Sequence, residues 1–150
     1  MRVSVIGGSS VGESTAATAE RLGRALATRG HTVVCGGKGG VMEAVCRGAV
    51  AAGGDTIGVL PSEDPDEANE YVETVLCTGL GHARNALVVL NGDAVIAVDG
   101  SGGTLSEVGF AAVYDRPIAG LEAFDAPHVE GCETPREAVA YVEAEAEAVY

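Results

Sequence analysis

The chain has 150 residues and a formal net charge of −13, with 22 acidic against 9 basic side chains. Its length and its 47% of hydrophobic residues suit one sizeable core and argue against a disordered or fibrous protein. We expect a single domain over residues 1–150. The strong negative charge disfavours nucleic acid and anionic membranes as partners.

Two further compositional features indicate a cytoplasmic protein. No apolar run approaches the roughly 20 residues of a membrane helix, and the apolar start of the chain is too short for a signal peptide. The four cysteines are scattered and the histidines lack metal-ligand spacing, so we expect free thiols and no metal site. Lys38 is the only lysine, and high acidity with so little lysine is typical of a halophilic cytoplasm. An ordinary acidic protein with few lysines remains the alternative.

Strand-like and helix-like stretches alternate along the chain. The expected order is strand 2–6, helix 13–29, strand 32–35, helix 40–52, strand 56–60, strand 72–77, helix 81–90, strand 94–98, helix 104–114, strand 117–121, a short strand 127–130 and helix 135–148. Ser10 and Glu13 have the spacing of a capping box before the first helix, and Thr134 and Glu137 have it at the last. Helices between short apolar strands predict a parallel sheet, hence an α/β fold: a Rossmann-like, doubly wound, three-layer α/β/α sandwich.

Glycine-rich turns interrupt the chain three times, each between a strand and a helix. They are Gly7–Ser10, Gly36–Gly40 and Asp99–Thr104. Glycine lets backbone N–H groups approach an anion closely, and the helix that follows adds unpaired donors and a positive dipole end. All three turns should lie at the carboxyl ends of parallel strands, where such sheets bind ligands. Together they predict a site for a phosphate-bearing molecule.

The turn around Lys38 is the best generic anion cradle of the three. It adds the single ammonium group of the chain to a run of glycine N–H groups. A structural turn with an exposed lysine is the competing interpretation. Neither a strict G-x-G-x-x-G nor a Walker-type G-K-[ST] is present, which disfavours a dinucleotide dehydrogenase and a P-loop NTPase.

Glu107 and Arg84 are the two ionisable side chains near these turns that could take part in binding or catalysis. Thr104 and Glu107 have capping-box spacing, so Glu107 either fixes a helix start or places a carboxylate beside the phosphate site. Arg84 stands near a helix N-terminus, where a cation is mildly unfavourable unless it faces an anionic ligand or Glu107. A surface arginine paired with any carboxylate is the alternative. His82 is interpreted as a cap or a surface residue without a catalytic role.

In combination these motifs resemble the "Lonely guy" family and the related molybdenum cofactor carrier proteins. The likeness covers residues from about 3 to 121. Gly36–Met42 reads G-G-K-G-G-V-M, and Asp99–Glu107 aligns with the family signature P-G-G-x-G-T-x-x-E. The resemblance implies that Arg84 and Glu107 are catalytic if the protein is an enzyme. With the glycine turns, it leads us to expect ligand contacts from Gly8, Ser9, Gly37, Lys38, Gly39, Gly40, Gly100, Ser101, Gly102, Gly103 and Thr104.

Three departures favour the compact carrier branch over the hydrolases. Asp99 replaces the signature proline, Ser101 replaces its second glycine, and Asn85 stands where the hydrolases usually carry a lysine. The first prediction is therefore a binding protein for a phosphorylated pterin- or nucleotide-like ligand, such as the molybdenum cofactor. The alternative is a phosphoribohydrolase that cleaves a nucleoside 5′-monophosphate into base and ribose 5-phosphate. A third interpretation is a structural or regulatory domain with a vestigial site. The resemblance also implies a homodimer or homotetramer.

Overall fold

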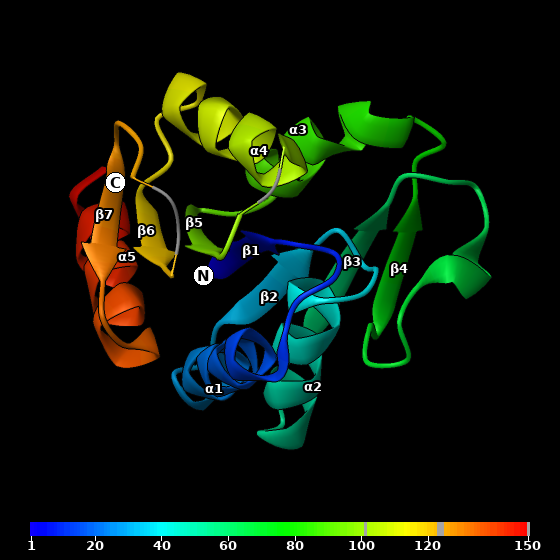
Figure 1. The fold of residues 1–150 in the computed structure, drawn as a ribbon, viewed down its shortest axis with the longest axis horizontal. Coiled ribbons are helices and arrows are strands. Elements are labelled where there is room, and N and C mark those ends of the chain that lie inside the picture. Colours follow the sequence, from blue (N-terminus) through cyan, green and yellow to red (C-terminus); the bar gives the residue numbers. More distant parts are fainter. Residues whose placement is uncertain (101, 123–124, 150) are drawn as a thin grey trace.

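The computed structural model describes residues 1–100, 102–122 and 125–149. Within them, seven parallel strands form one sheet in the order β4-β3-β2-β1-β5-β6-β7 (Figure 1). The strands are β1 Arg2–Gly7, β2 Thr32–Cys35, β3 Thr56–Leu60, β4 Thr74–Cys77, β5 Ala94–Val98, β6 Ile118–Leu121 and β7 Val129–Cys132. The predicted α/β, doubly wound parallel sheet is confirmed.

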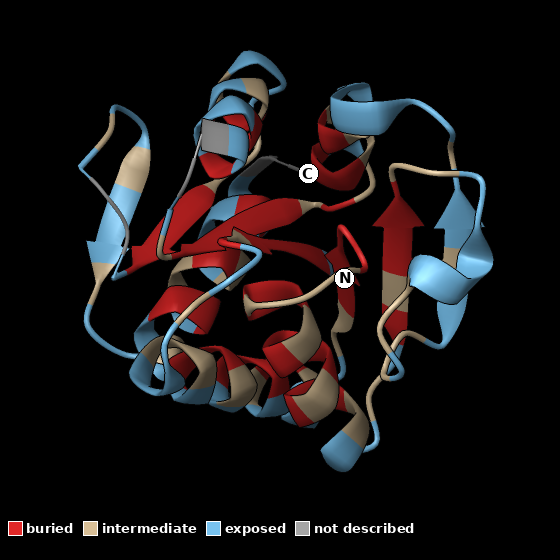
Figure 2. Ribbon diagram, turned by 45° about the vertical axis from the view of Figure 1, so that its right-hand side comes forward, coloured by how far each residue is buried: buried red, intermediate tan, exposed pale blue. Residues whose placement is uncertain are grey.

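Helices cover both faces of the sheet and make the molecule a three-layer sandwich. They are α1 Glu13–Thr28, α2 Val41–Ala51, α3 Arg84–Leu90, α4 Gly102–Val113 and α5 Pro135–Val149, with short 3₁₀ helices η1 Pro65–Glu67 and η2 Gly81–Ala83. One buried cluster joins α1, α2 and α5 to the sheet, and a second joins α3 and α4 to its other face. Figure 2 shows the central strands buried between these two layers.

The strands alternate in the way that burial on both faces demands. Val3 and Val5 of β1 belong to the cluster with α1, α2 and α5, whereas Ile6 belongs to the cluster with α3 and α4. On the first face, α1 and α2 approach so closely that glycine is required. A Cβ added at Gly48 would lie 2.0 Å from the carbonyl oxygen of Glu20, and one at Gly23 would lie 2.0 Å from that of Val45.

Several expected helix starts need correction. The Ser10–Glu13 capping box is wrong, because Gly12 is the N-cap of α1 and makes no side-chain capping bond. The helix expected at 104 begins at Gly102, so Thr104 lies inside its first turn. The helix expected from residue 81 opens as η2 and becomes α-helical only at Arg84.

Other local expectations are confirmed. Thr134 caps α5, since its Oγ1 accepts a hydrogen bond of 3.2 Å from the Glu137 N–H. Gly30 follows α1 with φ 79°, a conformation that suits a glycine after a helix. The short strand expected near 127–130 is β7, the edge strand beside β6.

The strand order places the site. The chain builds β1 to β4 in one direction and then crosses back to lay β5 on the other side of β1, so the order reverses between β1 and β5. All three glycine turns follow β1, β2 or β5, and therefore meet at the carboxyl ends of adjacent strands. This is where open parallel sheets bind ligands. In the part of the chain that the structure describes, no helix is long and apolar enough to cross a membrane.

Candidate functional site

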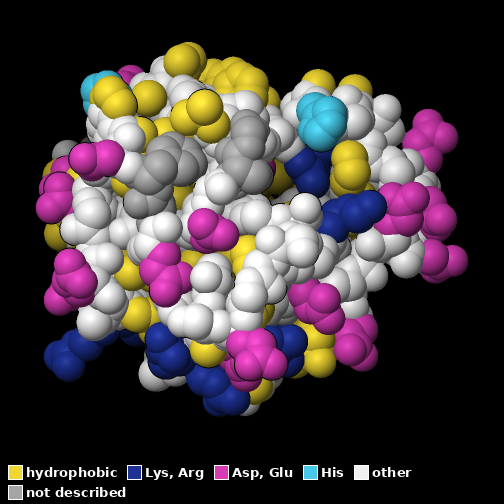
Figure 3. Space-filling view, viewed as in Figure 1, with side chains coloured by type: hydrophobic (Ala, Val, Ile, Leu, Met, Phe, Trp, Pro, Cys, Tyr) yellow, Lys and Arg dark blue, Asp and Glu magenta, His cyan; other side chains and the backbone are white. Residues whose placement is uncertain are grey.

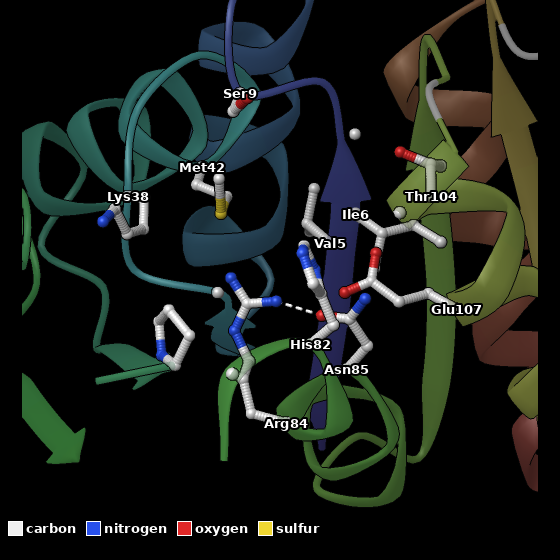
Figure 4. Close-up of a pocket in the computed structure, with 15 residues that line it drawn as sticks. Val5, Ile6, Ser9, Lys38, Met42, His82, Arg84, Asn85, Thr104 and Glu107 are labelled. Atoms are coloured by element: carbon white, nitrogen blue, oxygen red, sulfur yellow. Dashed lines mark hydrogen bonds between the residues drawn. The ribbon is translucent and has the colours of Figure 1, made fainter. Parts of the chain in front are cut away.

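A cavity of about 380 Å³ opens at the carboxyl edge of the sheet, between the two helical layers (Figure 4). Its lining residues are Val5, Ile6, Gly7, Ser9, Gly36, Lys38, Met42, Pro61, Gly81, His82, Arg84, Asn85, Gly103, Thr104 and Glu107. Valine, isoleucine, methionine and proline make part of the wall apolar. Figure 3 shows basic side chains and a histidine beside a hollow on this face, with acidic side chains around it and further basic side chains along the lower edge.

The first two glycine turns interlock behind the cavity wall. The Val41 N–H donates a hydrogen bond of 3.0 Å to the Gly8 carbonyl oxygen. Gly40 has φ 63°, and a Cβ there would lie 2.2 Å from the same oxygen. The Gly37 N–H is taken by the Cys35 sulfur at 3.3 Å. These glycines therefore have a structural task, whatever they also contribute to a ligand.

The predicted ligand contacts are divided between the wall and the turns behind it. Ser9, Lys38, Gly103 and Thr104 line the cavity. Five glycines stand outside the lining: Gly8, Gly37, Gly39, Gly40 and Gly100. Ser101 lies outside the described residues. For all of these positions, contact with a phosphate stays a prediction.

Lys38 is held by the acidic loop over residues 61–70. Its Nζ lies 3.3 Å from a Glu67 carboxylate oxygen, and both side chains are about 40% exposed. Asn69 fixes the loop to the turn, because its amide donates to the Lys38 carbonyl oxygen at 2.8 Å and its N–H donates to the Gly37 carbonyl oxygen at 2.8 Å. The loop is thus docked on the cradle and is more than a solvated connection. An ion pair this exposed is weak, so an incoming anion can compete for Lys38.

Arg84 is partly buried rather than a surface arginine. Its Nε donates a hydrogen bond of 3.0 Å to the Val59 carbonyl oxygen, and its Nη1 donates to the side-chain oxygen of Asn85. The guanidinium lies under the second turn, where a Cβ on Gly36 would come within 2.7 Å of Nη2. Burial lowers the Arg84 pKa, opposed by the charge of Glu107.

Glu107 faces the cavity from α4. Only 7% of the residue is exposed, and among the described residues its carboxyl accepts no hydrogen bond. Burial raises the Glu107 pKa to about 7, and the nearby positive charge of Arg84 only partly offsets this effect. The capping-box interpretation is wrong, because α4 starts before Thr104 and the Glu107 side chain points into the cavity (Figure 4). Near neutral pH this carboxyl is poised to give or take a proton.

Sequence reasoning missed the contribution of His82. The sequence predicts a cap or a surface residue, and His82 is indeed exposed, but it also lines the cavity together with Arg84 and Glu107 (Figure 4). The signal available was its place in the same turn as Arg84. In the part of the chain that the structure describes, no group of three or more His, Cys, Asp or Glu side chains is placed to hold a metal ion.

Comparison with known proteins places this fold and cavity in a family. A model of the SLOG cluster4 family matches residues 1–149. An uncharacterized protein of Archaeoglobus fulgidus is 39% identical over 94% of the chain and 93% of its own length. A cytokinin riboside 5′-monophosphate phosphoribohydrolase of Mycobacterium tuberculosis is 31% identical over 75% of the chain, and a probable one of rice is 38% identical over 71%. The chain spans 64% and 46% of those two enzymes, respectively.

Several solved structures are similar over nearly their whole length, and two of them serve as examples. The molybdenum cofactor binding protein of Rippkaea orientalis superposes with a TM-score of 0.90 at 31% identity, covering 95% of each chain. The molybdenum cofactor carrier protein of Chlamydomonas reinhardtii gives 0.87 at 31% identity, covering 96% of this chain and 97% of its own. By sequence and by structure, the chain belongs to the SLOG cluster4 family within the Lonely guy-like superfamily, on the side of the molybdenum cofactor carrier proteins.

Proposed function

We propose that the protein binds a phosphorylated, pterin- or nucleotide-like small molecule in this cavity, as a molybdenum cofactor carrier does. The observation that carries the proposal is the placement of Arg84 and Glu107 beside the cavity that the glycine turns adjoin. A phosphate would lie against the turns that bear Ser9, Gly103 and Thr104. The rest of the ligand would lie along the apolar wall.

The cavity suits such a ligand in size and in chemistry. About 380 Å³ falls within the range of small-molecule sites. A flat heterocycle with ring N–H and amino groups needs an acceptor, and the Glu107 carboxyl supplies one that is not already used among the described residues. Arg84 and His82 line the same cavity and favour an anion. The near-complete overlap with the carrier structures, against partial coverage of the hydrolases, supports the carrier over the enzyme.

Ligand analysis of purified protein tests this function. The wild type is purified from a bacterial host that makes the molybdenum cofactor, and bound pterin is oxidised and measured by fluorescence. We expect close to one pterin per site, and a loss of about tenfold or more in Arg84→Gln because a charged partner of the ligand is removed. Arg24→Gln, on the exposed surface of α1, is the matched control and should keep the pterin. Wild-type protein without pterin from such a host would contradict the proposal.

A specific observation also favours the second function, hydrolysis of nucleoside 5′-monophosphates. A carboxyl with a pKa of about 7 opposite an arginine suits general acid–base chemistry on an N-glycosidic bond. Incubation with AMP, with free adenine followed by chromatography, distinguishes the two functions. If the wild type released adenine steadily and Glu107→Gln did not, the protein would be a hydrolase and not a carrier. Retention of pterin without release of adenine would support the carrier. If the protein neither retained pterin nor released adenine, the vestigial-site interpretation would take their place.

A further inference from the structure

Arg84 and Glu107 share a cavity without forming a salt bridge. An arginine and a carboxylate in one partly buried site normally form a direct, charge-assisted pair, which is among the stronger interactions in proteins. Here, among the described residues, the guanidinium bonds instead to the Val59 carbonyl oxygen and to the Asn85 amide oxygen. The Glu107 carboxyl is left with no hydrogen-bond partner in the same set.

Asn85 is fixed between these two groups. Only 3% of it is exposed, and both ends of its amide are used. Its oxygen accepts from Arg84, and its nitrogen donates a bond of 3.1 Å to the Ser106 hydroxyl oxygen. Ser106 in turn donates to the Gly103 carbonyl oxygen at 2.7 Å, which ties the chain of bonds to the first turn of α4. Figure 4 shows the Asn85 amide lying between the guanidinium and the Glu107 carboxyl.

We infer that Asn85 is a positioning residue that holds Arg84 away from Glu107, so that both groups remain available to one ligand instead of neutralising each other. An amide suits this task because it has no charge of its own. Its oxygen satisfies the guanidinium, and its N–H₂ group anchors the amide on α4. The high pKa of Glu107 is consistent with a carboxyl that its nearest cation does not contact.

Other polar and charged side chains line the same cavity, and their effect on the Glu107 carboxyl has to be separated from that of Asn85. Arg84 and His82 approach from α3 and η2, and Lys38 approaches from the turn before α2, where Glu67 already pairs with it. The buried Cys35 thiol interacts electrostatically with both Arg84 and Glu107. Burial has the largest effect on the Glu107 pKa, and Arg84 is the charged group that lowers it, so a change in the position of Arg84 should change this pKa.

Titration of Glu107 in the ligand-free protein tests the inference. The carboxyl carbon is labelled with ¹³C and its pKa is followed by NMR in the wild type, Asn85→Ala and Asn85→Asp. In Asn85→Ala the freed guanidinium should turn to Glu107 and lower its pKa by about one to three units. In Asn85→Asp the acceptor for Arg84 remains and a negative charge is added, so the Glu107 pKa should stay high or rise. A merely structural role would move both variants in the same direction.

The titration tests the role of Asn85 whether or not the Asn85→Ala variant folds. An unchanged Glu107 pKa in folded Asn85→Ala would overturn the inference. Should Asn85→Ala fail to fold, a fall of the Glu107 pKa in Asn85→Asp would overturn it. Arg24→Gln, on the exposed surface of α1, is the control and should leave the pKa of Glu107 within about half a unit of wild type. The inference rests on the proposed site, but the titration needs no ligand, so failure to find bound pterin would leave its result intact.

Discussion

At Asp99 the backbone adopts φ 58°, in the left-handed region that few residues other than glycine, asparagine and aspartate tolerate. The family signature has proline at this position. Proline fixes φ near −65° and has no N–H, whereas the Asp99 N–H donates a bond of 3.0 Å to the Leu121 carbonyl oxygen. The departure from the signature is therefore a change of backbone conformation at the end of β5, as well as a change of charge.

Restoring the signature proline should destabilise this protein. We expect Asp99→Pro to lower the free energy of unfolding by about 3 kcal/mol or more, because the ring forbids the conformation and removes the bond to Leu121. Asp99→Gly should be neutral or stabilising by up to about 1 kcal/mol, since glycine adopts positive φ freely. Urea unfolding of both variants measures the difference. A folded Asp99→Pro of wild-type stability would show that the turn adopts another conformation.

The stability of the protein should depend on pH through Glu107. Its pKa is about 7 in the folded state, against 4.5 for the ordinary group. The folded state therefore holds this proton more tightly, and its contribution to the free energy of unfolding falls as the pH rises from about 4.5 to about 7. The free energy of unfolding of Glu107→Gln relative to wild type should therefore increase by up to about 3 kcal/mol as the pH rises through this window, and it should change little further above or below it.

Chemical unfolding at a series of pH values measures this gain. Glu145→Gln is the control, because its carboxyl lies on the exposed surface of α5 and is in water in both states. A difference between Glu107→Gln and wild type that stays constant from pH 4 to about pH 8 would show that burial does not raise the Glu107 pKa.

Among the elements, the contact of α1 with α2 is the most demanding. A helix-interior glycine normally costs about 1 kcal/mol relative to alanine. At Gly48 the clash with the Glu20 carbonyl oxygen should outweigh that gain, so we expect Gly48→Ala to lose about 2 kcal/mol net. Ala51→Gly, on the exposed end of the same helix, measures propensity alone and should cost at most about 1 kcal/mol. A more stable Gly48→Ala would mean that the two helices separate easily.

The order and type of elements could be predicted from the sequence, because short apolar strands and glycine-bounded helices leave a strong local signal. The three glycine turns could be located for the same reason. The resemblance to the Lonely guy family indicated Arg84 and Glu107, which both line the cavity, and their roles there stay predictions. Local signals misled where the spacing of two residues fits more than one role. Thr104 and Glu107 have the spacing of a capping box, but α4 begins at Gly102 and the carboxyl turns into the cavity. The partners of Arg84 and Lys38 depend on tertiary contacts that no spacing reveals.

For the whole molecule, the resemblance and α4 lead us to expect an assembly. Leu105 is 57% exposed and Val113 is 73% exposed, and with Gly109 they recur every four residues along one side of the helix. We predict that this stripe packs against a second copy of the chain, giving a homodimer or homotetramer. Light scattering after size exclusion should give the mass of a dimer or a tetramer for the wild type and the mass of a monomer for Val113→Glu. Ala140→Glu, on the exposed face of α5, should leave the mass unchanged, and a monomeric wild type would refute the prediction.

The charge of the whole molecule sets a second expectation. A net charge of −13 repels itself in dilute buffer, and salt shortens the screening length from about 10 Å at 0.1 M to about 3 Å at 1 M. We expect the free energy of unfolding to rise between these salt concentrations. It should rise less in Glu145→Lys, because this substitution makes the net charge less negative. Unchanged stability on dialysis from molar salt into dilute buffer would count against a salt-adapted protein.

The strand order also determines which folded state a bound molecule can stabilise. The cavity wall begins in β1 at Val5 and is completed in α4 at Glu107, with strands and helices from between them adding the rest. No local part of the chain holds a complete site, so a ligand can stabilise only the state in which β1, β2, β5 and both helical layers are assembled. Its binding free energy should therefore slow the hydrogen exchange of amides that open by global unfolding, including those distant from the cavity in α5. Slower exchange in α5 after ligand is added would therefore report the occupancy of a cavity that α5 does not line.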